Sequence, residues 1–91
     1  MSILEDPEFA KLRRFKNKMD INIVSKILDE IELDLKSSKN IKTSIIYIYS
    51  IYIDEVKKNK EFYDIVAEIL QKYSQKIGAE NVIELILNSI K

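Results

Sequence analysis

The side chains that most often carry catalysis are absent from this chain. Its 91 residues include no histidine and no cysteine, and the one glycine is Gly78. Histidine is the commonest general base, cysteine is the commonest thiol nucleophile, and both are usual ligands of zinc. A single glycine also cannot form the glycine-rich loop that holds a phosphate group. The sequence therefore predicts a protein that is not an enzyme and that binds no cofactor.

Carboxylates are the remaining side chains that could hold a metal ion. Glu30 and Asp34 are four residues apart, so on a helix they would lie on one face and could share a divalent cation. The same spacing is found on acidic helix surfaces that simply face solvent, which is the commoner arrangement. We therefore expect no metal site, and a metal-dependent enzyme is the third and least favoured interpretation.

A basic run near the N-terminus indicates contact with an anion. The segment KLRRFKNK would place Lys11, Arg14 and Lys18 along one helix face, where like charges repel unless an anion lies opposite. That anion could be phosphate, or the acidic residues 29–34 of this chain or of a partner, and the acidic residues are favoured because the chain supplies them. The alternative function is direct DNA or RNA binding. The residues that would carry it are Lys11, Arg13, Arg14, Lys18, Lys57, Lys58 and Lys60.

The charges sum to zero over the whole chain but alternate in sign along it. Residues 1–20 carry +1, residues 21–35 carry −3, residues 36–60 carry +4 and residues 61–91 carry −2. This alternation favours charge matching between helices within the fold or with a second copy. Neutrality is not typical of a dedicated nucleic-acid carrier, whose surface would be basic throughout.

Capping residues and apolar spacing predict where most helices begin and end. Apolar side chains recur at steps of three and four residues on both sides of a central Ile/Tyr segment, as in packed amphipathic helices. The first helix is predicted to begin at Asp6 and Pro7, the second at Asp20 or Asn22, and the fourth at Asn59. The second should end in the polar stretch 36–40 and the fourth at Gly78, and the fifth should cover residues 79–91.

The central segment, SIIYIYSIYIDEV at residues 44–56, has the composition of a strand but the spacing of a helix. A strand here would need burial on both faces, and the chain has no second convincing strand to pair with it. Its apolar run is about half of the roughly 20 residues that a membrane span requires. A helix collects most apolar residues in an arc of about 160° and leaves Thr43, Ser44, Ser50, Asp54 and Glu55 outside it. The apolar arc contains Ile41, Ile45, Ile46, Ile48, Tyr49, Tyr52, Ile53 and Val56.

Two apolar residues fall on the polar side of this third helix. Tyr47 and Ile51 are four residues apart and would form a second apolar patch with a phenol at its edge. Such a patch has the composition of a protein interface centre, so we predict that it binds a partner. The alternative is that another helix or the N-terminal arm covers it as ordinary core.

These patterns predict an all-α compact bundle of four to five amphipathic helices, forming a single helical domain over residues 1–91. Helices two, three and four would build the core, and helix five would close it. The expected function is a small non-enzymatic interaction module, an accessory or scaffold subunit of a homodimer or of a larger complex that could process nucleic acid. The partner would be a protein, either a second copy or another chain, and we expect no membrane and no small-molecule substrate.

Composition also bears on the protein's origin and location. The absence of cysteine, and an N-terminus unlike a signal peptide, predict a cytoplasmic protein. Isoleucine, lysine and glutamate are abundant, which favours a thermophilic archaeon or its virus, although a host with an AT-rich genome would give a similar bias.

Overall fold

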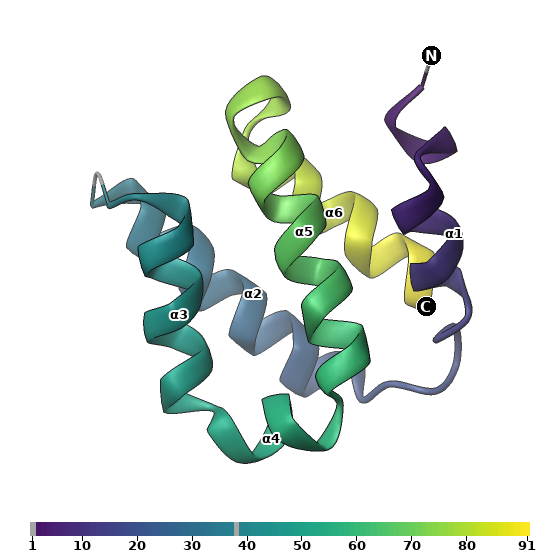
Figure 1. The fold of residues 1–91 in the computed structure, drawn as a ribbon, viewed down its shortest axis with the longest axis horizontal. Coiled ribbons are helices and arrows are strands. Elements are labelled where there is room, and N and C mark those ends of the chain that lie inside the picture. Colours follow the sequence, from purple (N-terminus) through teal and green to yellow (C-terminus); the bar gives the residue numbers. More distant parts are fainter. Residues whose placement is uncertain (1, 38) are drawn as a thin grey trace.

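The chain folds into helices throughout the described part. The computed structural model describes residues 2–37 and 39–91, and within them it contains six α-helices, one short 3-10 helix and no strand (Figure 1). The all-α prediction is confirmed, while the number of helices exceeds the four to five expected. In chain order the elements are η1 (Ile3–Glu5), α1 (Pro7–Arg13), α2 (Ile21–Lys36), α3 (Ile41–Ile51), α4 (Ile53–Lys58), α5 (Lys60–Ile77) and α6 (Ala79–Ile90).

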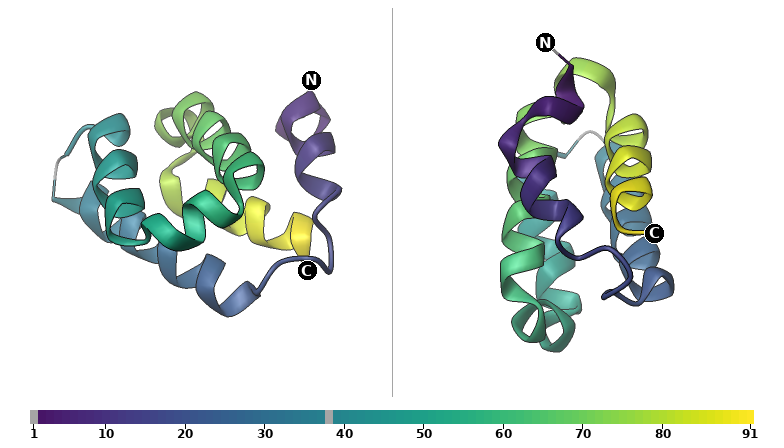
Figure 2. Two further views of the ribbon diagram at one scale, coloured as in Figure 1. Left: turned by 60° about the horizontal axis from the view of Figure 1, so that its bottom comes forward. Right: turned by 90° about the vertical axis from the view of Figure 1, so that its right-hand side faces the viewer.

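The helices form two layers (Figure 2). In one layer α5 lies between α3 and α1, which form its two edges, and α2 and α6 cross behind them. The shape measures 31 × 30 × 18 Å, and its short dimension is about that of two stacked helices, each roughly 10 Å across. Because α3 lies at an edge and packs on α2 and α5, one of its faces is left uncovered by another helix.

Short polar side chains begin three of the helices as capping residues. Asp6 Oδ1 accepts from the Glu8 amide of α1 at 2.9 Å, and Asp20 Oδ1 accepts from the Asn22 amide of α2 at 2.9 Å. Asp20, one of the two predicted candidates, is therefore the cap of α2. Asn40 caps α3 in the same way. Asn59 is the N-cap residue of α5, as predicted, but its side chain makes no capping hydrogen bond, and its amide donates instead to the Glu55 carboxylate at 2.7 Å.

Asp6 also ties the N-terminal arm to α5. Its second carboxylate oxygen accepts hydrogen bonds from the Tyr73 hydroxyl and from Lys72 Nζ, the latter at 3.0 Å. Together with the Glu8 amide, these donors lower the pKa of Asp6 to about 2, and the Tyr73 bond is the largest cause. The carboxylate is thus ionised at neutral pH, where it fixes α1 beside the fourth turn of α5.

One cluster of buried apolar side chains fills the space between the layers. The predicted apolar faces of the second, fourth and fifth helices are buried as expected. The last helix is more central than predicted, because α6 packs against α1, α2 and α5 rather than only closing the core. The cluster consists of Phe9, Leu12, Val24, Ile27, Leu28, Ile31, Ile45, Ile48, Phe62, Tyr63, Ile65, Val66, Ile69, Leu70, Val82, Ile83, Ile86 and Ile90.

The Ile/Tyr segment is helical, but it is two helices rather than one. The chain leaves helical geometry at Tyr52, with φ −107° and ψ 35°, and α4 then turns toward α5. β-Branched and aromatic residues lose side-chain freedom in a helix, so this run has little intrinsic preference to stay continuous. The predicted inward arc is also partly wrong, because Ile46 and Ile53 are exposed.

A phenol on α3 connects the segment to the core. Tyr49 packs edge-on against Tyr63, with ring centroids 5.5 Å apart, and its hydroxyl donates to the Tyr63 carbonyl of α5 at 2.9 Å. Burial raises the pKa of Tyr49 far above its ordinary value, so the hydroxyl remains a neutral donor. This bond sets which side of α3 faces α5.

The first helix is shorter than its apolar pattern predicts. α1 ends at Arg13, and the chain continues through turns in which Asn17 adopts a left-handed φ of 64°. The Asn17 amide donates to the Ile90 carbonyl at 3.1 Å, so this turn is held by the end of α6. Phe15 and Met19 still pack on the core, but Lys18 does not share a helix face with Lys11 as predicted.

The boundaries after α2 and α5 follow the sequence signals. α2 ends at Lys36 with Ser37 as its C-cap, and the remainder of the predicted polar stretch includes Ser38, which lies outside the described residues. α5 stops at Gly78, whose φ of 90° favours glycine. In the part of the chain that the structure describes, no helix is long and apolar enough to cross a membrane.

Replacement of Leu28 by alanine should destabilise the fold by about 2 to 5 kcal/mol, because the side chain is fully buried and its loss leaves a cavity. Urea unfolding of the two proteins gives this difference. Leu33→Ala on the same helix is the matched control, since Leu33 is 62% exposed and should change stability by less than about 0.5 kcal/mol. Equal effects of the two changes would contradict this packing of α2.

Candidate functional site

A cleft between α2 and α3 gathers polar and apolar side chains at the surface. It encloses about 350 Å³. α2 contributes acidic side chains one helical turn apart, and α3 contributes the two residues predicted as a partner-binding patch. The lining residues are Glu30, Leu33, Asp34, Ser37, Tyr47, Ile48 and Ile51.

Three oxygen atoms beside this cleft are buried without a hydrogen-bond partner among the described residues. They are Glu30 Oε2, Asp34 Oδ2 and Ser44 Oγ. Ser44 belongs to α3 and is fully buried, although its position in the sequence predicted the polar side of the helix. A buried polar atom without a partner costs free energy, so such atoms commonly mark a place where water or an ion binds.

The hydroxyl of Ser44 acts on the Asp34 carboxylate from across the cleft. It is the largest single cause lowering the pKa of Asp34, although the pair falls short of full hydrogen-bond geometry, and Lys39 lowers the same pKa through a hydrogen bond and through its charge. Glu30 interacts in turn with Tyr52, and this contact raises the pKa of the phenol. Asp34 is therefore an anion at neutral pH, and its buried Oδ2 makes no full hydrogen bond within the described residues.

A lysine from the connection between the helices already occupies one edge of the cleft. Lys39 Nζ lies 3.1 Å from Asp34 Oδ1 and 5.1 Å from the centre of the Tyr47 ring. The lysine side chain is 49% exposed, whereas that of Asp34 is 12% exposed. The contact is thus a half-solvated ion pair that uses one carboxylate oxygen and leaves Oδ2 free of this lysine.

Tyr47 and Ile51 lie at the surface. Their exposed fractions are 52% and 54%, so no helix or N-terminal arm covers them in the described structure. Leu33, which lines the same cleft, and Ile46 of α3 are also more than half exposed. Their arrangement fits the apolar patch that the sequence indicates, and its role in binding a partner stays a prediction.

The basic residues considered for nucleic-acid binding do not form one patch. Lys11, Arg14 and Lys60 line a groove of about 710 Å³ between α1 and α5, while Lys18 and Lys58 line a different pocket. Arg13 lines neither of these two pockets. The remaining residue of the set, Lys57, is exposed at the end of α4.

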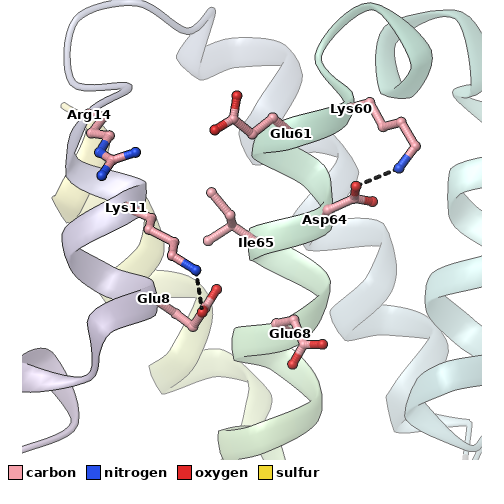
Figure 3. Close-up of a pocket in the computed structure, with 8 residues that line it drawn as sticks. All are labelled: Glu8, Lys11, Arg14, Lys60, Glu61, Asp64, Ile65 and Glu68. Carbon is pink, nitrogen blue, oxygen red and sulfur yellow. Dashed lines mark hydrogen bonds and ion pairs between the residues drawn. The ribbon is translucent and has the colours of Figure 1, made fainter.

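Carboxylates accompany the cations in the α1–α5 groove (Figure 3). Lys11 pairs with Glu8 at 3.1 Å on its own helix, and Lys60 pairs with Asp64 on α5. Glu61 and Glu68 of α5 line the same groove. The expectation that residues 29–34 of this chain face the basic run is wrong, because α1 packs on α5 and α6 rather than on α2.

A second acidic groove lies between α2 and α6. Asp29 and Glu32 face it from α2, and Glu80 and Glu84 face it from α6. In the described residues, however, no three acidic side chains converge closely enough, here or elsewhere, to form a ready-made metal cage. Three of the four buried side-chain oxygens without a partner among the described residues, those of Glu30, Asp34 and Ser44, lie instead where α2 meets α3, and the fourth, Ser74 Oγ, is on α5.

These features define a small all-α protein whose most distinctive polar site is an oxygen-lined cleft at an edge helix. The chain matches the model of the family described as "Calcium binding protein SSO6904" over residues 1–90, and it belongs to that family. The solution structure of an archaeal protein, SSO6904 from hyperthermophilic Sulfolobus solfataricus, is 69% identical to this chain and superposes with a TM-score of 0.93. That comparison covers 100% of this chain and 92% of the relative. No curated protein matches.

The archaeal relative agrees with the composition, which favours a thermophilic archaeal origin. Of the residues beside the cleft, the sequence indicated Tyr47, Ile51 and the pair Glu30 and Asp34, although the acidic pair was expected to be solvated. Ser44 was missed. Its place one turn before the buried Ile48 is the only hint in the sequence, and that spacing alone does not show which flank of α3 meets α2.

Replacement of Ser44 by alanine should raise the pKa of Asp34, because the hydroxyl is the largest single cause of the lowering, and Lys39→Ala should raise it as well, because the lysine lowers it through a hydrogen bond and through its charge. Since the folded pKa is below the unfolded one, this interaction stabilises the fold above about pH 4 and is lost as pH falls through the folded pKa. The Ser44→Ala variant should therefore gain less stability than the parent between acid and neutral pH.

NMR titration of the Asp34 carboxyl carbon, in buffer containing a chelator, measures both shifts. An unchanged Asp34 pKa in Ser44→Ala would contradict the assignment of the hydroxyl as a cause.

Proposed function

We propose that this protein binds calcium in the cleft between α2 and α3, with Glu30 and Asp34 as its charged ligands. The observation that carries the proposal is the group of buried, unpartnered oxygens at Glu30, Asp34 and Ser44. The description of the family as a calcium-binding protein supports the choice of ion. This proposal departs from the expectation, drawn from sequence, that the chain has no metal site.

The chemistry of these side chains fits calcium. Calcium binds oxygen ligands from carboxylates, neutral oxygens and water, and it tolerates irregular geometry better than magnesium does. Two carboxylates neutralise the ion, and the Ser44 hydroxyl is a neutral oxygen beside Asp34. Because six to eight ligands are typical, water would supply the rest of the coordination shell. A site with two charged ligands should bind weakly, with a Kd on the order of 10⁻⁴ to 10⁻³ M.

The α2–α6 groove is the competing location for the ion. It has more carboxylates, but its acidic residues other than Glu32 are exposed, and Glu32 pairs with Lys36 at 3.3 Å. Exposed carboxylates are already solvated by water and gain little from a bound ion. Because Glu30 and Asp34 each have a buried oxygen without a partner, a cation that binds there gains more free energy than one in the α2–α6 groove.

Calorimetric titration of calcium into the protein tests the proposal. The parent should bind one ion, and Glu30→Gln combined with Asp34→Asn should weaken binding by at least about tenfold, because a buried charge-assisted contact contributes about 1.5 kcal/mol or more. The matched control is Glu80→Gln combined with Glu84→Gln, which removes the same charge from the other groove and should leave the affinity within about twofold.

Two results would contradict this site. One is that the parent gives no heat of binding at millimolar calcium and no calcium-dependent change in its NMR spectrum. The other is that the α6 pair of substitutions weakens binding as much as the α2 pair does, which would place the ion in the α2–α6 groove or in the diffuse field of the acidic surface.

A second candidate function is that of a non-enzymatic helical interaction module, and the exposure of Tyr47 and Ile51 favours it. Large apolar side chains that are more than half exposed and lie together on one uncovered helix face are typical of binding surfaces. The partner would be a second copy or another protein. Direct nucleic-acid binding is less favoured, since phosphates entering the α1–α5 groove would meet Glu61 and Glu68.

Replacement of Tyr47 by serine and of Ile51 by lysine should leave the melting temperature within a few degrees of the parent, because both side chains are exposed. Any association measured by sedimentation should be lost, and association of the parent should persist at high salt, as expected for apolar contacts. Unfolding of the double variant would instead assign the two residues to the core.

A further inference from the structure

We propose that the α2–α3 cleft docks a basic amphipathic helix of another protein, with one lysine or arginine of that helix held between Asp34 and Tyr47. This inference rests on the second candidate function, the partner-binding role of Tyr47 and Ile51, and it names the chemistry of the partner. It does not depend on calcium, although both ligands would use Asp34 and should exclude each other.

Lys39 demonstrates how the cleft holds a cation. Its ammonium nitrogen lies 3.1 Å from the Asp34 carboxylate and 5.1 Å from the centre of the Tyr47 ring. A carboxylate and an aromatic face together attract a cation through charge and through the ring quadrupole. Because Lys39 is half exposed, its own ion pair contributes little stability, and a cation from a partner can replace it.

The apolar part of the cleft matches one face of an amphipathic helix. Leu33, Tyr47 and Ile51 line the same cleft as Asp34, and each is more than half exposed. They come from two neighbouring helices, α2 and α3, so a third helix can lie along the space between them. Apolar contact would supply affinity, and the cation at Asp34 would select helices that carry a basic residue beside their apolar face.

Charge distinguishes this partner from a second copy. In a two-fold dimer the same patch meets itself, so each copy would have to present a cation to the other's acidic residues. The cation at this patch, Lys39, already pairs with Asp34 of its own chain. Two copies would therefore bring Glu30 and Asp34 of both chains together while each Lys39 is already paired with Asp34 of its own chain, whereas a basic helix supplies additional positive charge.

The test is a fluorescence-anisotropy titration with a labelled helical peptide of leucine and lysine, about 18 residues long so that it can form a helix on binding. Buffer with a chelator and about 0.15 M salt removes calcium and screens long-range attraction. The parent should bind this peptide, and a leucine–glutamate peptide of the same pattern should not bind. Asp34→Asn and Ile51→Lys should each weaken binding by about tenfold or more.

Lys39→Ala gives the sharpest prediction, because removing the competing lysine should strengthen peptide binding by about two- to fivefold. Lys42→Ala is the matched control. It makes the same change in net charge in the same segment, but Lys42 forms no ion pair within the described residues, so its effect should stay within about 1.5-fold. Addition of calcium should weaken peptide binding to the parent if both occupy the cleft.

Three results would overturn the proposal. They are equal binding of the lysine and glutamate peptides, equal gains in Lys39→Ala and Lys42→Ala, and absence of binding to both the parent and Lys39→Ala. Self-association that Ile51→Lys abolishes, without peptide binding, would assign the patch to a second copy instead. The calcium titration contains no peptide and the peptide titration contains no calcium, so failure of one leaves the other result intact.

Discussion

Burial of the apolar faces of α2, α5 and α6 against one another is the constraint from which the rest of the structure follows. A chain of this length buries a modest fraction of its surface, so these side chains must all face one shared core. Once α2 is fixed by Val24, Leu28 and Ile31, its neighbouring acidic face is carried to the seam with α3. The position of the candidate site is therefore a consequence of core packing.

The edge position of α3 explains how one helix serves both the core and the surface. Ile45 and Ile48 point into the cluster, and the opposite face has no further helix in the described fold to cover it. Tyr47 and Ile51 remain at the surface for this reason. The same geometry brings Ser44 against Asp34, so an apolar surface and a set of polar oxygens share one short cleft.

Periodicity in the sequence predicted the helices better than it predicted their ends. The spacing of apolar residues located the core faces of α2, α5 and α6, because burial on one side repeats with the helical turn. The turn after α1 is held by the contact between Asn17 and Ile90, which local pattern does not contain, and the exact break at Tyr52 falls within a run whose apolar spacing continues across it.

The candidate site likewise contains residues that the sequence indicated and residues that it did not. Tyr47 and Ile51 were recognisable because an apolar pair interrupts a polar face. The environment of Glu30 and Asp34 could not be recognised from the sequence, because carboxylates at i and i+4 have the same spacing whether they face water or a neighbouring helix. Ser44 required knowledge of which flank of α3 meets α2, and that depends on the order of the helices in space rather than in sequence.

The hydrogen bond from Tyr49 to the backbone of α5 has a consequence for recognition. A helix held only by apolar packing can roll about its long axis at small cost, but a directional bond at one point removes that freedom. α3 is therefore presented in a single orientation before any ligand arrives. Less disorder is then lost on association, so even a small surface could achieve useful selectivity.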